Sequence, residues 1–584
     1  MAILTRTRMQ IRQLRIENFR GISSLLWKPG RPFCCVIGPG DSGKSTVLDA
    51  VEAALSSRWF AFAESDFRNC DTSASIVVEA TVGELSKALK SDERFGLYVR
   101  GWTRVGNLRD EPEDDDEPVL TVRLTVDATL EPVWELVCDR VPDARTISNR
   151  DRALFGLLRL AGDDARQLSW AQGSVLSRLT GDSADAGARL AQAYRAAKDS
   201  AKLHEIESLA QAAEAAEGFA KGLGAYVEDG YAPGLELGRA GLSSGSIALL
   251  DGGVPLRLAG LGTRRLATLA IQKSAISEGA IVLVDEIEHG LEPHRIMGAI
   301  AQLKADQAKA LKEARPVGQV LLTTHSDVVL GEVGAVGLFV CHTSRPGRET
   351  ALIPPSDPAK IKSLMRHTPR ALFARRILVC EGMTEVGILM GIRENWPEKH
   401  SGMPIERFGG AITDGNGNEA AAICLALAGL GYEVALFRDS DTEIPAGDRE
   451  KLAAANVAVF EYGSGLNTEE AVFLAASDFR VQDLLDYARE ERGSGSVDDN
   501  VVLKIPSVDR ELVKEHFMAW ELSGDVSGEE LRRELAKLAG QKKWFKDQRI
   551  GRGMAPIVWG VVGDDPETPL AKTISAAEQW LYGT

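Results

Sequence analysis

Short apolar segments, each ending in a glycine or a polar residue, recur along the chain. The clearest are Phe33–Ile37, Ala280–Val284, Gln319–Leu322, Ile377–Cys380 and Val434–Phe437. Runs this short, bounded by turn signals, are typical of strands buried in a parallel sheet. Helical patterns separate them, such as TVLDAVEAAL after the first run. The pattern predicts an α/β protein whose functional residues follow the carboxyl ends of its strands.

The residues after Ile37 form a predicted phosphate-binding loop. Gly38 to Ser45 fit the pattern G-x-x-x-x-G-K-[ST], and the helix that follows points its positive N-terminal end at the same anions. Lys44 is expected to reach the β and γ phosphates of ATP, and Ser45 to hold Mg²⁺. The predicted ATP-binding residues of this loop are Gly38, Pro39, Gly40, Asp41, Ser42, Gly43, Lys44, Ser45 and Thr46.

Two further strand ends supply the other groups that ATP hydrolysis needs. Asp285 follows one apolar run and is expected to bind ATP through the magnesium shell, while Glu286 polarises the attacking water. His325, in the sequence TTHSD after another run, is expected to contact the γ-phosphate as a catalytic residue. A structural role for His325 is the alternative, because a lone histidine often has one.

These spacings resemble the ABC-type ATPases of the RecF and SMC kind, as does the opening segment IRQLRIENFRG. Leu258–Gln272 lies where the signature helix of those proteins would be, with Gly262 and Thr263 as its ATP contacts, although it departs from L-S-G-G-Q. The segment GLEPHR resembles their D-loop, with Glu292 where Asp is usual, and no Q-loop is evident. Since the signature of one protomer closes over the P-loop of another in that family, the resemblance implies a homodimer or a larger homo-oligomer.

An alanine-rich stretch interrupts the ATPase. Its apolar positions recur at three-to-four spacing, which predicts helices that pack together or between protomers; they include Leu190, Tyr194, Ala197, Ile206, Leu209 and Ala213. The expected organisation is an ATPase in two parts (1–160 and 241–345), a helical dimerisation insert (161–240), a linker (346–374) and a C-terminal domain (375–584).

The C-terminal half places acidic residues after two predicted strands. ILVCEGMTEVGILMG delivers Glu381 and Glu385, and YEVALFRDSDTE delivers Asp439 and Asp441, which point the same way if the segment is extended. The turn and helix between them, TDGNGNEAAAICLALAGLG, suit a parallel βαβ unit. Carboxylates gathered on one sheet edge repel one another unless divalent cations lie between them, and two such cations can clamp a phosphodiester. A solvent-facing position for Glu385 is the alternative.

This arrangement resembles the TOPRIM domain of topoisomerases, primases and some nucleases, a Rossmann-like fold. An ABC-type ATPase followed by TOPRIM resembles the OLD (overcoming lysogenization defect) family, and within it the class that includes the Gabija anti-phage nuclease subunit. The resemblance implies an ATP-regulated, Mg²⁺-dependent DNA endonuclease in bacterial defence, in which Mn²⁺ can replace Mg²⁺, with a helicase partner and a helical insert in the TOPRIM domain. The implied metal ligands are Glu381, which is also catalytic, Glu385, Asp439 and Asp441.

Two more segments resemble that family. TEEAVF, from Thr468, implies that Glu469 lies beside the second metal, and KKWFKDQRIGRG, from Lys542, implies that Lys546 acts catalytically at the scissile phosphate. Each has an alternative role. Glu469 can interact with a helix dipole, and Lys546 can be one of several DNA-binding cations that follow the phosphate backbone. These cations are Lys542, Lys543, Lys546 and Arg549.

Composition narrows the functional classes. The 584 residues carry a net charge of −16, so any nucleic-acid site must be a local basic patch or act through bound cations. No apolar run of about 18 residues predicts a membrane span. The seven cysteines form no C-x-x-C pair, which together with an N-terminus unlike a signal peptide favours a reducing, cytoplasmic setting. The alternative function is a DNA-repair or genome-maintenance ATPase of RecF or SMC type whose TOPRIM domain binds DNA without cutting it.

Overall fold

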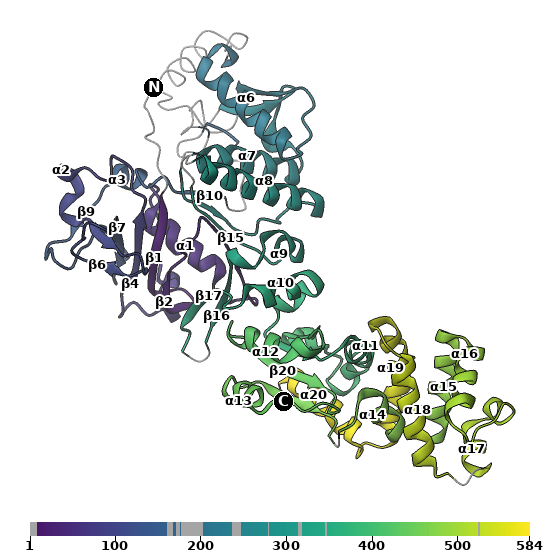
Figure 1. Cartoon of the computed structure of the whole chain (residues 1–584). Helices are drawn as coiled ribbons and strands as arrows, with labels where there is room; N and C mark the ends of the chain where they lie inside the picture. The colour runs from purple at the N-terminus through teal and green to yellow at the C-terminus, as the bar shows by residue number, and fades with distance from the viewer. Residues whose placement is uncertain are drawn as a thin grey trace. The chain divides into compact units, whose positions relative to one another are not determined.

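A computed structural model of the chain describes residues 9–160, 168–170, 174, 176, 203–235, 247–277, 279–313, 318–344, 347–463, 465–523 and 526–583. The chain divides into two compact units, Met1–Pro354 (unit 1) and Pro355–Thr584 (unit 2) (Figure 1). Among the described residues, no helix is long and apolar enough to cross a membrane.

Unit 1 contains a six-stranded sheet that is mostly parallel. Its strand order is β10 (Leu158–Leu160), β14 (Val282–Val284), β15 (Val320–Thr323), β3 (Phe33–Ile37), β16 (Leu338–Thr343) and β17 (Thr350–Ile353), with only β17 antiparallel to its neighbour. Three of the predicted apolar runs are therefore its central strands. Their side chains are almost entirely buried, as expected for a sheet covered on both faces.

An eight-stranded antiparallel sheet packs into the same core. It consists of β1 (Gln10–Phe19), β2 (Ile22–Trp27), β4 (Ile76–Gly83), β5 (Arg100–Trp102), β6 (Leu108–Arg109), β7 (Glu117–Val126), β8 (Pro132–Leu136) and β9 (Arg145–Thr146). In β1 the buried positions step by three residues from Ile11 to Leu14 and then by two to Ile16. A register shift between Ile11 and Gln13 explains the extra residue, because a bulge inserts one position into the alternation.

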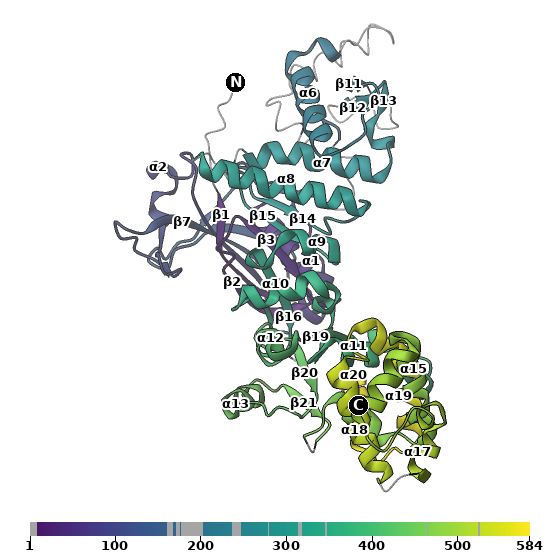
Figure 2. The same ribbon diagram turned by 45° about the vertical axis from the view of Figure 1, so that its right-hand side comes forward.

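Helices of unit 1 flank the mostly parallel sheet. They are α1 (Lys44–Leu55), α7 (Leu261–Ser277), α8 (Pro293–Lys312) and α9 (Asp327–Val333), and Figure 2 shows α8 and α9 beside β14 and β15. In the predicted insert, α6 (Glu207–Gly222) buries Leu209 and Ala213 and packs against α7 and β11 (Tyr231–Leu235) of the same chain. β11 pairs with β12 (Ile247–Asp251), and β12 with β13 (Val254–Pro255). Leu190, Tyr194 and Ala197 lie outside the described residues.

Unit 2 is built on a four-stranded parallel sheet. The order is β19 (Gly410–Asp414), β18 (Arg376–Cys380), β20 (Glu433–Arg438) and β21 (Ala458–Glu461). The predicted adjacency of the two acid-bearing strands is confirmed, because β18 pairs with β20 in parallel. The connection between them is longer than one helix, since β19 intervenes in the sequence and pairs with the other side of β18.

Helices surround this sheet and extend into a larger helical group (Figure 1). They are α10 (Pro358–His367), α11 (Met383–Ile392), α12 (Ala420–Ala428), α13 (Ala446–Ala454), α14 (Thr468–Ala475), α15 (Asp478–Arg492), α16 (Ser494–Lys504), α17 (Phe517–Ser523), α18 (Gly528–Lys542), α19 (Gln548–Asp564) and α20 (Pro569–Tyr582). One hydrophobic core joins β18 and β20 to α11 and to helices α14 to α20. β17 and α10 lie within the stretch expected to be a linker.

Candidate functional sites

The phosphate-binding loop of unit 1 lies between β3 and α1. Gly38 has a φ of 145°, and a Cβ at this position would stand 2.4 Å from the carbonyl oxygen of Cys341, so glycine is required. The buried Lys44 ammonium donates to the carbonyls of Gly38 (3.0 Å) and Pro39 (2.8 Å). Burial lowers the pKa of Lys44. The loop thus curls around a cation that is placed to meet phosphate oxygens.

The two groups expected to hold Mg²⁺ touch each other. Ser45 Oγ donates to Asp285 Oδ1 at 3.0 Å, and Thr323 Oγ1 donates to the same oxygen at 2.6 Å. The other oxygen, Asp285 Oδ2, pairs with Arg159 of β10 at 2.9 Å. A serine hydroxyl and a carboxylate are hard oxygen ligands of the kind that Mg²⁺ takes. The residues present therefore fit a magnesium ion bound together with nucleotide phosphates.

Arg159 was not expected from the sequence. Its guanidinium, whose side chain is 8% exposed, also pairs with Asp49 at 2.6 Å and with Glu52 at 3.4 Å, both on α1. It thereby joins the helix that carries Ser45 to the strand that carries Asp285. An arginine inside the apolar run LLRL was the available signal, because a charged residue in a buried strand needs partners.

Glu286 follows β14 in a left-handed conformation, with a φ of 47°. Its backbone N–H donates to Thr323 Oγ1 at 2.9 Å, and its carbonyl accepts from the Arg265 guanidinium at 3.1 Å. These bonds hold the backbone while the exposed side chain stays available to a water. The residue predicted to polarise the attacking water is therefore held at the carboxyl end of the central strands.

His325 lies in the same site. Its backbone N–H donates to Glu288 Oε1 at 2.6 Å. The pKa of its imidazole is lowered by burial and then by the charge of Lys44, while the acids Glu288, Glu286 and Asp285 oppose this shift. The charges of Lys44 and Glu286 both act on His325, so this histidine lies close to the groups that are expected to surround the γ-phosphate.

The predicted signature and D-loop segments pack against each other. A Cβ on Gly262, next to Thr263 at the start of α7, would lie 2.9 Å from the carbonyl oxygen of Gly290. Glu292, the residue that replaces the usual Asp, pairs with Arg295 at 3.3 Å. The structure therefore brings the two segments together, and their contact with nucleotide stays a prediction.

The second candidate site lies at the carboxyl edge of the sheet in unit 2. Glu381 follows β18, and its N–H donates to the carbonyl of Phe437 in β20 at 2.8 Å. Asp439 follows β20 and hydrogen-bonds with the exposed Asp441. The segment after β20 is a bend, so the two aspartates meet through a turn rather than along an extended strand. The acids predicted from two strand ends are brought together.

Asp439 is the residue that reports this proximity most clearly. Its pKa is raised to about 8 by burial, then by the hydrogen bond with Asp441 and by the charges of Glu381, Asp441 and Glu385. Its Oδ1 is buried and has no hydrogen-bond partner among the described residues. A buried carboxylate oxygen without a donor is costly unless it is protonated or meets a cation.

Glu385 and Glu469 form the buried side of the cluster, with exposed fractions of 7% and 8%. The Thr468 hydroxyl donates to Glu385 Oε1 at 2.6 Å, so Glu385 does not face solvent. The pKa of Glu469 is raised, mainly by burial and also by the charges of Glu385 and Asp441, while the charge of Lys546 opposes this shift. Glu469 and Lys546 therefore both lie beside the acids of β18 and β20.

Two residues of this edge were missed in the sequence. Asp414 ends β19 beside Cys380, and its Oδ1 is buried without a hydrogen-bond partner among the described residues. Arg438 ends β20 and donates to Glu381 Oε2 at 3.0 Å and to the carbonyl of Thr442 at 2.7 Å, which orients Glu381. The strand that ends in Asp414 reads GAITD, so Asp414 lacks the preceding apolar run that identified Glu381.

The donor set can be tested against a metal ion. All the groups are hard carboxylate oxygens, and two of them, on Asp414 and Asp439, have no hydrogen-bond partner in the part of the chain that the structure describes, which suits Mg²⁺ or Mn²⁺. Within the described residues, however, no three acidic, histidine or cysteine side chains already stand in a metal-holding arrangement. The chemistry of the residues fits a metal, and their side chains must converge further to enclose one.

The predicted basic patch extends from the end of α18 to the start of α19. Lys542 and Lys543 end α18, while Lys546 and Arg549 flank the start of α19; all four are exposed. The Thr384 hydroxyl of α11 donates to the carbonyl of Phe545 at 3.3 Å, which anchors this segment next to Glu385. The patch thus adjoins the carboxylates.

Asp439→Asn is expected to stabilise the metal-free protein more at about pH 8 than at about pH 4. The folded pKa of about 8 exceeds the ordinary 3.8, so between these values the unfolded chain has released a proton that the folded state retains. Wild-type stability therefore falls as pH rises through this window. After allowance for solvent screening, the gain near pH 8 is about 1 kcal/mol, or roughly 2–4 °C. Thermal unfolding in EDTA measures it; an equal shift at both pH values would contradict it.

Comparison with known proteins covers part of the chain. Residues 157–331 match the family model described as "AAA domain, putative AbiEii toxin, Type IV TA system". This segment contains Asp285, Glu286 and His325, and together with the phosphate-binding loop it makes unit 1 an ATPase domain. No curated protein matches the chain.

Solved structures resemble it at low sequence identity. An Smc head bound to the C-terminal winged-helix domain of ScpA is 14% identical, with a TM-score of 0.36, and the match covers 59% of this chain and 97% of that one. The Pyrococcus furiosus Smc head with an extended coiled coil is 13% identical, with a TM-score of 0.38, and the match covers 61% of this chain and 99% of that one. The recombination mediator RecF with ATP is 13% identical, with a TM-score of 0.33, and the match covers 57% of this chain and 98% of that one.

Proposed function

We propose that the protein is an ATP-regulated, divalent-metal-dependent DNA endonuclease of the OLD family, in the class that resembles the Gabija nuclease subunit and acts in anti-phage defence. The observation that carries the proposal is the gathering of Glu381, Glu385, Asp439 and Glu469 at one sheet edge beside an exposed basic segment. The neighbouring acids raise the pKa of Asp439, and among the described residues its buried Oδ1 has no hydrogen-bond donor. Such a cluster costs folding free energy, so a purely structural role does not explain it. The parallel sheet β19-β18-β20-β21 supports a TOPRIM domain here.

Each residue has a role in this proposal. Glu381, Asp439 and Asp441 hold one metal, and Glu385 and Glu469 hold a second. Bound divalent cations supply an activated water and neutralise charge on the leaving oxygen. Arg438 keeps Glu381 directed into the site, and Thr468 does the same for Glu385. Lys546 contacts the scissile phosphate, and Lys542, Lys543 and Arg549 bind the flanking backbone.

In unit 1, Lys44 and the backbone of residues 38–46 bind the phosphates of ATP. Ser45 and Asp285 hold Mg²⁺, which offsets phosphate charge when bound. Glu286 orients the attacking water, and His325 contacts the γ-phosphate. The residues proposed for ATP turnover and those proposed for cleavage belong to different units, so a substitution can remove one activity and leave the other.

The test is incubation of the purified protein with supercoiled plasmid and Mn²⁺ or Mg²⁺, with EDTA as the control. Nicked or linear product that requires the metal is expected. Intact plasmid under all conditions would contradict the nuclease proposal.

The alternative, a genome-maintenance ATPase whose second unit binds DNA without cutting it, has one observation in its favour. This is the lack of a ready metal-holding arrangement among the described residues. It predicts retarded but intact DNA in the same assay.

We also expect a homodimer or a larger assembly. The exposed start of α7, where Leu261 has an exposed fraction of 36%, would close over the phosphate-binding loop of a second protomer if the signature resemblance holds. Light scattering with and without ATP measures the mass. A monomer at micromolar concentration in both conditions would contradict this expectation. A helicase partner is proposed on the Gabija resemblance alone.

A further inference from the structure

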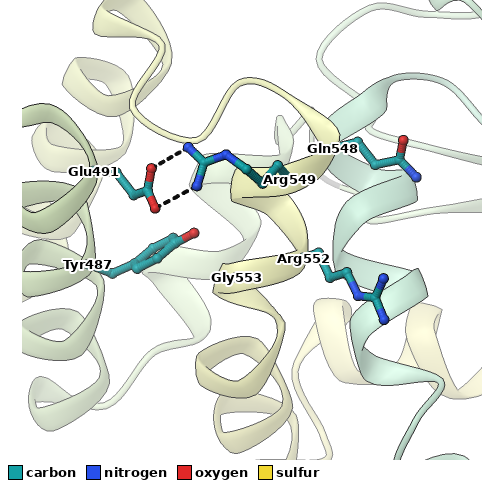
Figure 3. A pocket seen from close by; sticks show the side chains of 6 residues that line it. All are labelled: Tyr487, Glu491, Gln548, Arg549, Arg552 and Gly553. Carbon is teal, nitrogen blue, oxygen red and sulfur yellow. Dashed lines mark hydrogen bonds and ion pairs between the residues drawn. The ribbon is translucent and has the colours of Figure 1, made fainter.

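A pocket opens between α15 and α19 in unit 2. Its volume is about 580 Å³, and six residues line it: Tyr487, Glu491, Gln548, Arg549, Arg552 and Gly553. Figure 3 shows Arg549 reaching from α19 across to Glu491 of α15, with Tyr487 below this pair. Arg549 was predicted from the sequence to bind DNA, whereas no role was predicted for Glu491.

The wall of the pocket is well defined. The Tyr487 hydroxyl donates to the carbonyl of Ile550 in the first turn of α19 at 2.9 Å. A Cβ on Gly553 would stand 2.0 Å from that hydroxyl, so only glycine admits the tyrosine. The Tyr487 ring also lies parallel to Phe545, at 6.3 Å between centroids. These contacts fix the start of α19 against α15.

Arg549 and Glu491 form a two-pronged ion pair. The guanidinium nitrogens donate to Glu491 Oε1 at 2.9 Å and Oε2 at 2.6 Å, and this bond lowers the pKa of Glu491. The Arg549 side chain is nevertheless 71% exposed, compared with 17% for Glu491. A guanidinium fork that fits a carboxylate also fits a phosphate, with the same planar geometry. Glu491 therefore occupies the position in which a phosphate would bind Arg549.

The pocket lies next to the carboxylate cluster. Lys546, which senses Glu469, is three residues before Arg549, and Arg552 is three residues after it; all three are exposed. The hydrogen bond from Thr384, the neighbour of Glu385, to Phe545 fixes this segment beside the cluster. Lys546 lies two residues before the start of α19, and three residues of chain span at most about 10–11 Å. A strand contacted by Lys546 can therefore continue to Arg549.

We propose that this pocket binds a backbone phosphate of the DNA strand that extends from the carboxylate cluster, and that Glu491 competes with this phosphate for Arg549. The inference rests on the proposed nuclease function and deepens it. The phosphate can compete with Glu491 because the Arg549 side chain remains largely exposed, and because a phosphate contact also releases counterions from the DNA. Glu491 thus keeps Arg549 extended but weakens DNA binding.

The test is binding of a short labelled duplex, measured by fluorescence anisotropy over a range of salt concentrations. Ca²⁺, which carboxylates bind, is present throughout, and a gel afterwards checks that the duplex is intact. Arg549→Ala should weaken binding about three- to tenfold and reduce the slope of log K against log salt by about 0.9. Arg549→Lys keeps the positive charge but loses the two-pronged guanidinium contact, so its DNA affinity should lie between those of the wild type and Arg549→Ala. Glu491→Gln should instead tighten binding by about two- to fivefold, since it frees Arg549.

Arg533 and Glu529 of α18 supply the matched control, because they form an exposed arginine–glutamate pair at 2.9 Å in the same unit. Arg533→Ala and Glu529→Gln should leave binding unchanged. If Arg549→Ala binds the duplex as tightly as the wild type does, the proposed phosphate site is wrong. Weaker binding in Glu491→Gln, as in Arg549→Ala, would show that the pair only supports the fold and would overturn the competition. Failure of the wild type to bind DNA would overturn the proposed function as well.

Discussion

The Glu286→Gln variant is expected to bind ATP and to hydrolyse it more slowly by on the order of 10²-fold or more. A neutral glutamine polarises and orients the attacking water less effectively than the carboxylate of Glu286. The substitution should not disturb the site, because the contacts of Glu286 with Thr323 and Arg265 use its backbone. Phosphate release measures turnover, and a fluorescent ATP analogue measures binding.

Lys44→Ala belongs to the same prediction and should lose binding as well. Its ammonium is held by the carbonyls of Gly38 and Pro39, so removing it takes the only cation from the centre of the loop as the structure describes it. Lys312→Ala, at the exposed end of α8, is the control and should behave as the wild type. Wild-type hydrolysis in both Glu286→Gln and Lys44→Ala would disprove the assigned ATP site.

Asp439→Asn is expected to reduce DNA cleavage by at least about 10²-fold. Asp439 is the carboxylate that faces Glu381, Glu385 and Asp441 together, so its loss removes the group that the proposed metal needs most. The fold should survive, because the pKa of Asp439 is raised and an uncharged side chain relieves that repulsion. Cleavage of plasmid under Mn²⁺ and Mn²⁺ binding by calorimetry should both fall.

Asp499→Asn is the matched control for this second prediction. Asp499 is an exposed aspartate on α16 that pairs with Arg510 at 3.5 Å. Its substitution should change neither metal binding nor cleavage. Equal losses in Asp499→Asn and Asp439→Asn would point to a general effect of charge and would contradict a specific site.

Acids at strand ends were predictable from the sequence because two local signals coincide. An apolar run identifies a buried parallel strand, and the residue after it must emerge at the carboxyl edge. This reasoning located Glu381 and Asp439, and β18 does pair with β20. The same logic placed Asp285 next to the phosphate-binding loop, where Ser45 contacts it.

Pairings that depend on tertiary contacts were not predictable. Arg159 lies inside an apolar run and Arg438 directly after one, and only the folded chain shows that they bind Asp285 and Glu381. Asp414 was not predictable because its strand, Gly410–Asp414, contains only two apolar residues other than glycine, Ala411 and Ile412, and therefore has a weak strand pattern. The bidentate contact of Arg549 with Glu491 joins two residues that are 58 positions apart in the sequence, which no local pattern indicates.

The most direct test of the nuclease centre is to measure plasmid cleavage and ATP turnover on one preparation of Asp439→Asn, beside the wild type, with Mn²⁺ or Mg²⁺. Cleavage should be lost while ATP turnover stays at the wild-type rate, since Lys44, Asp285 and Glu286 belong to the other unit. Cleavage at the wild-type rate would contradict the metal site. Loss of both activities in a well-folded variant would contradict their separation.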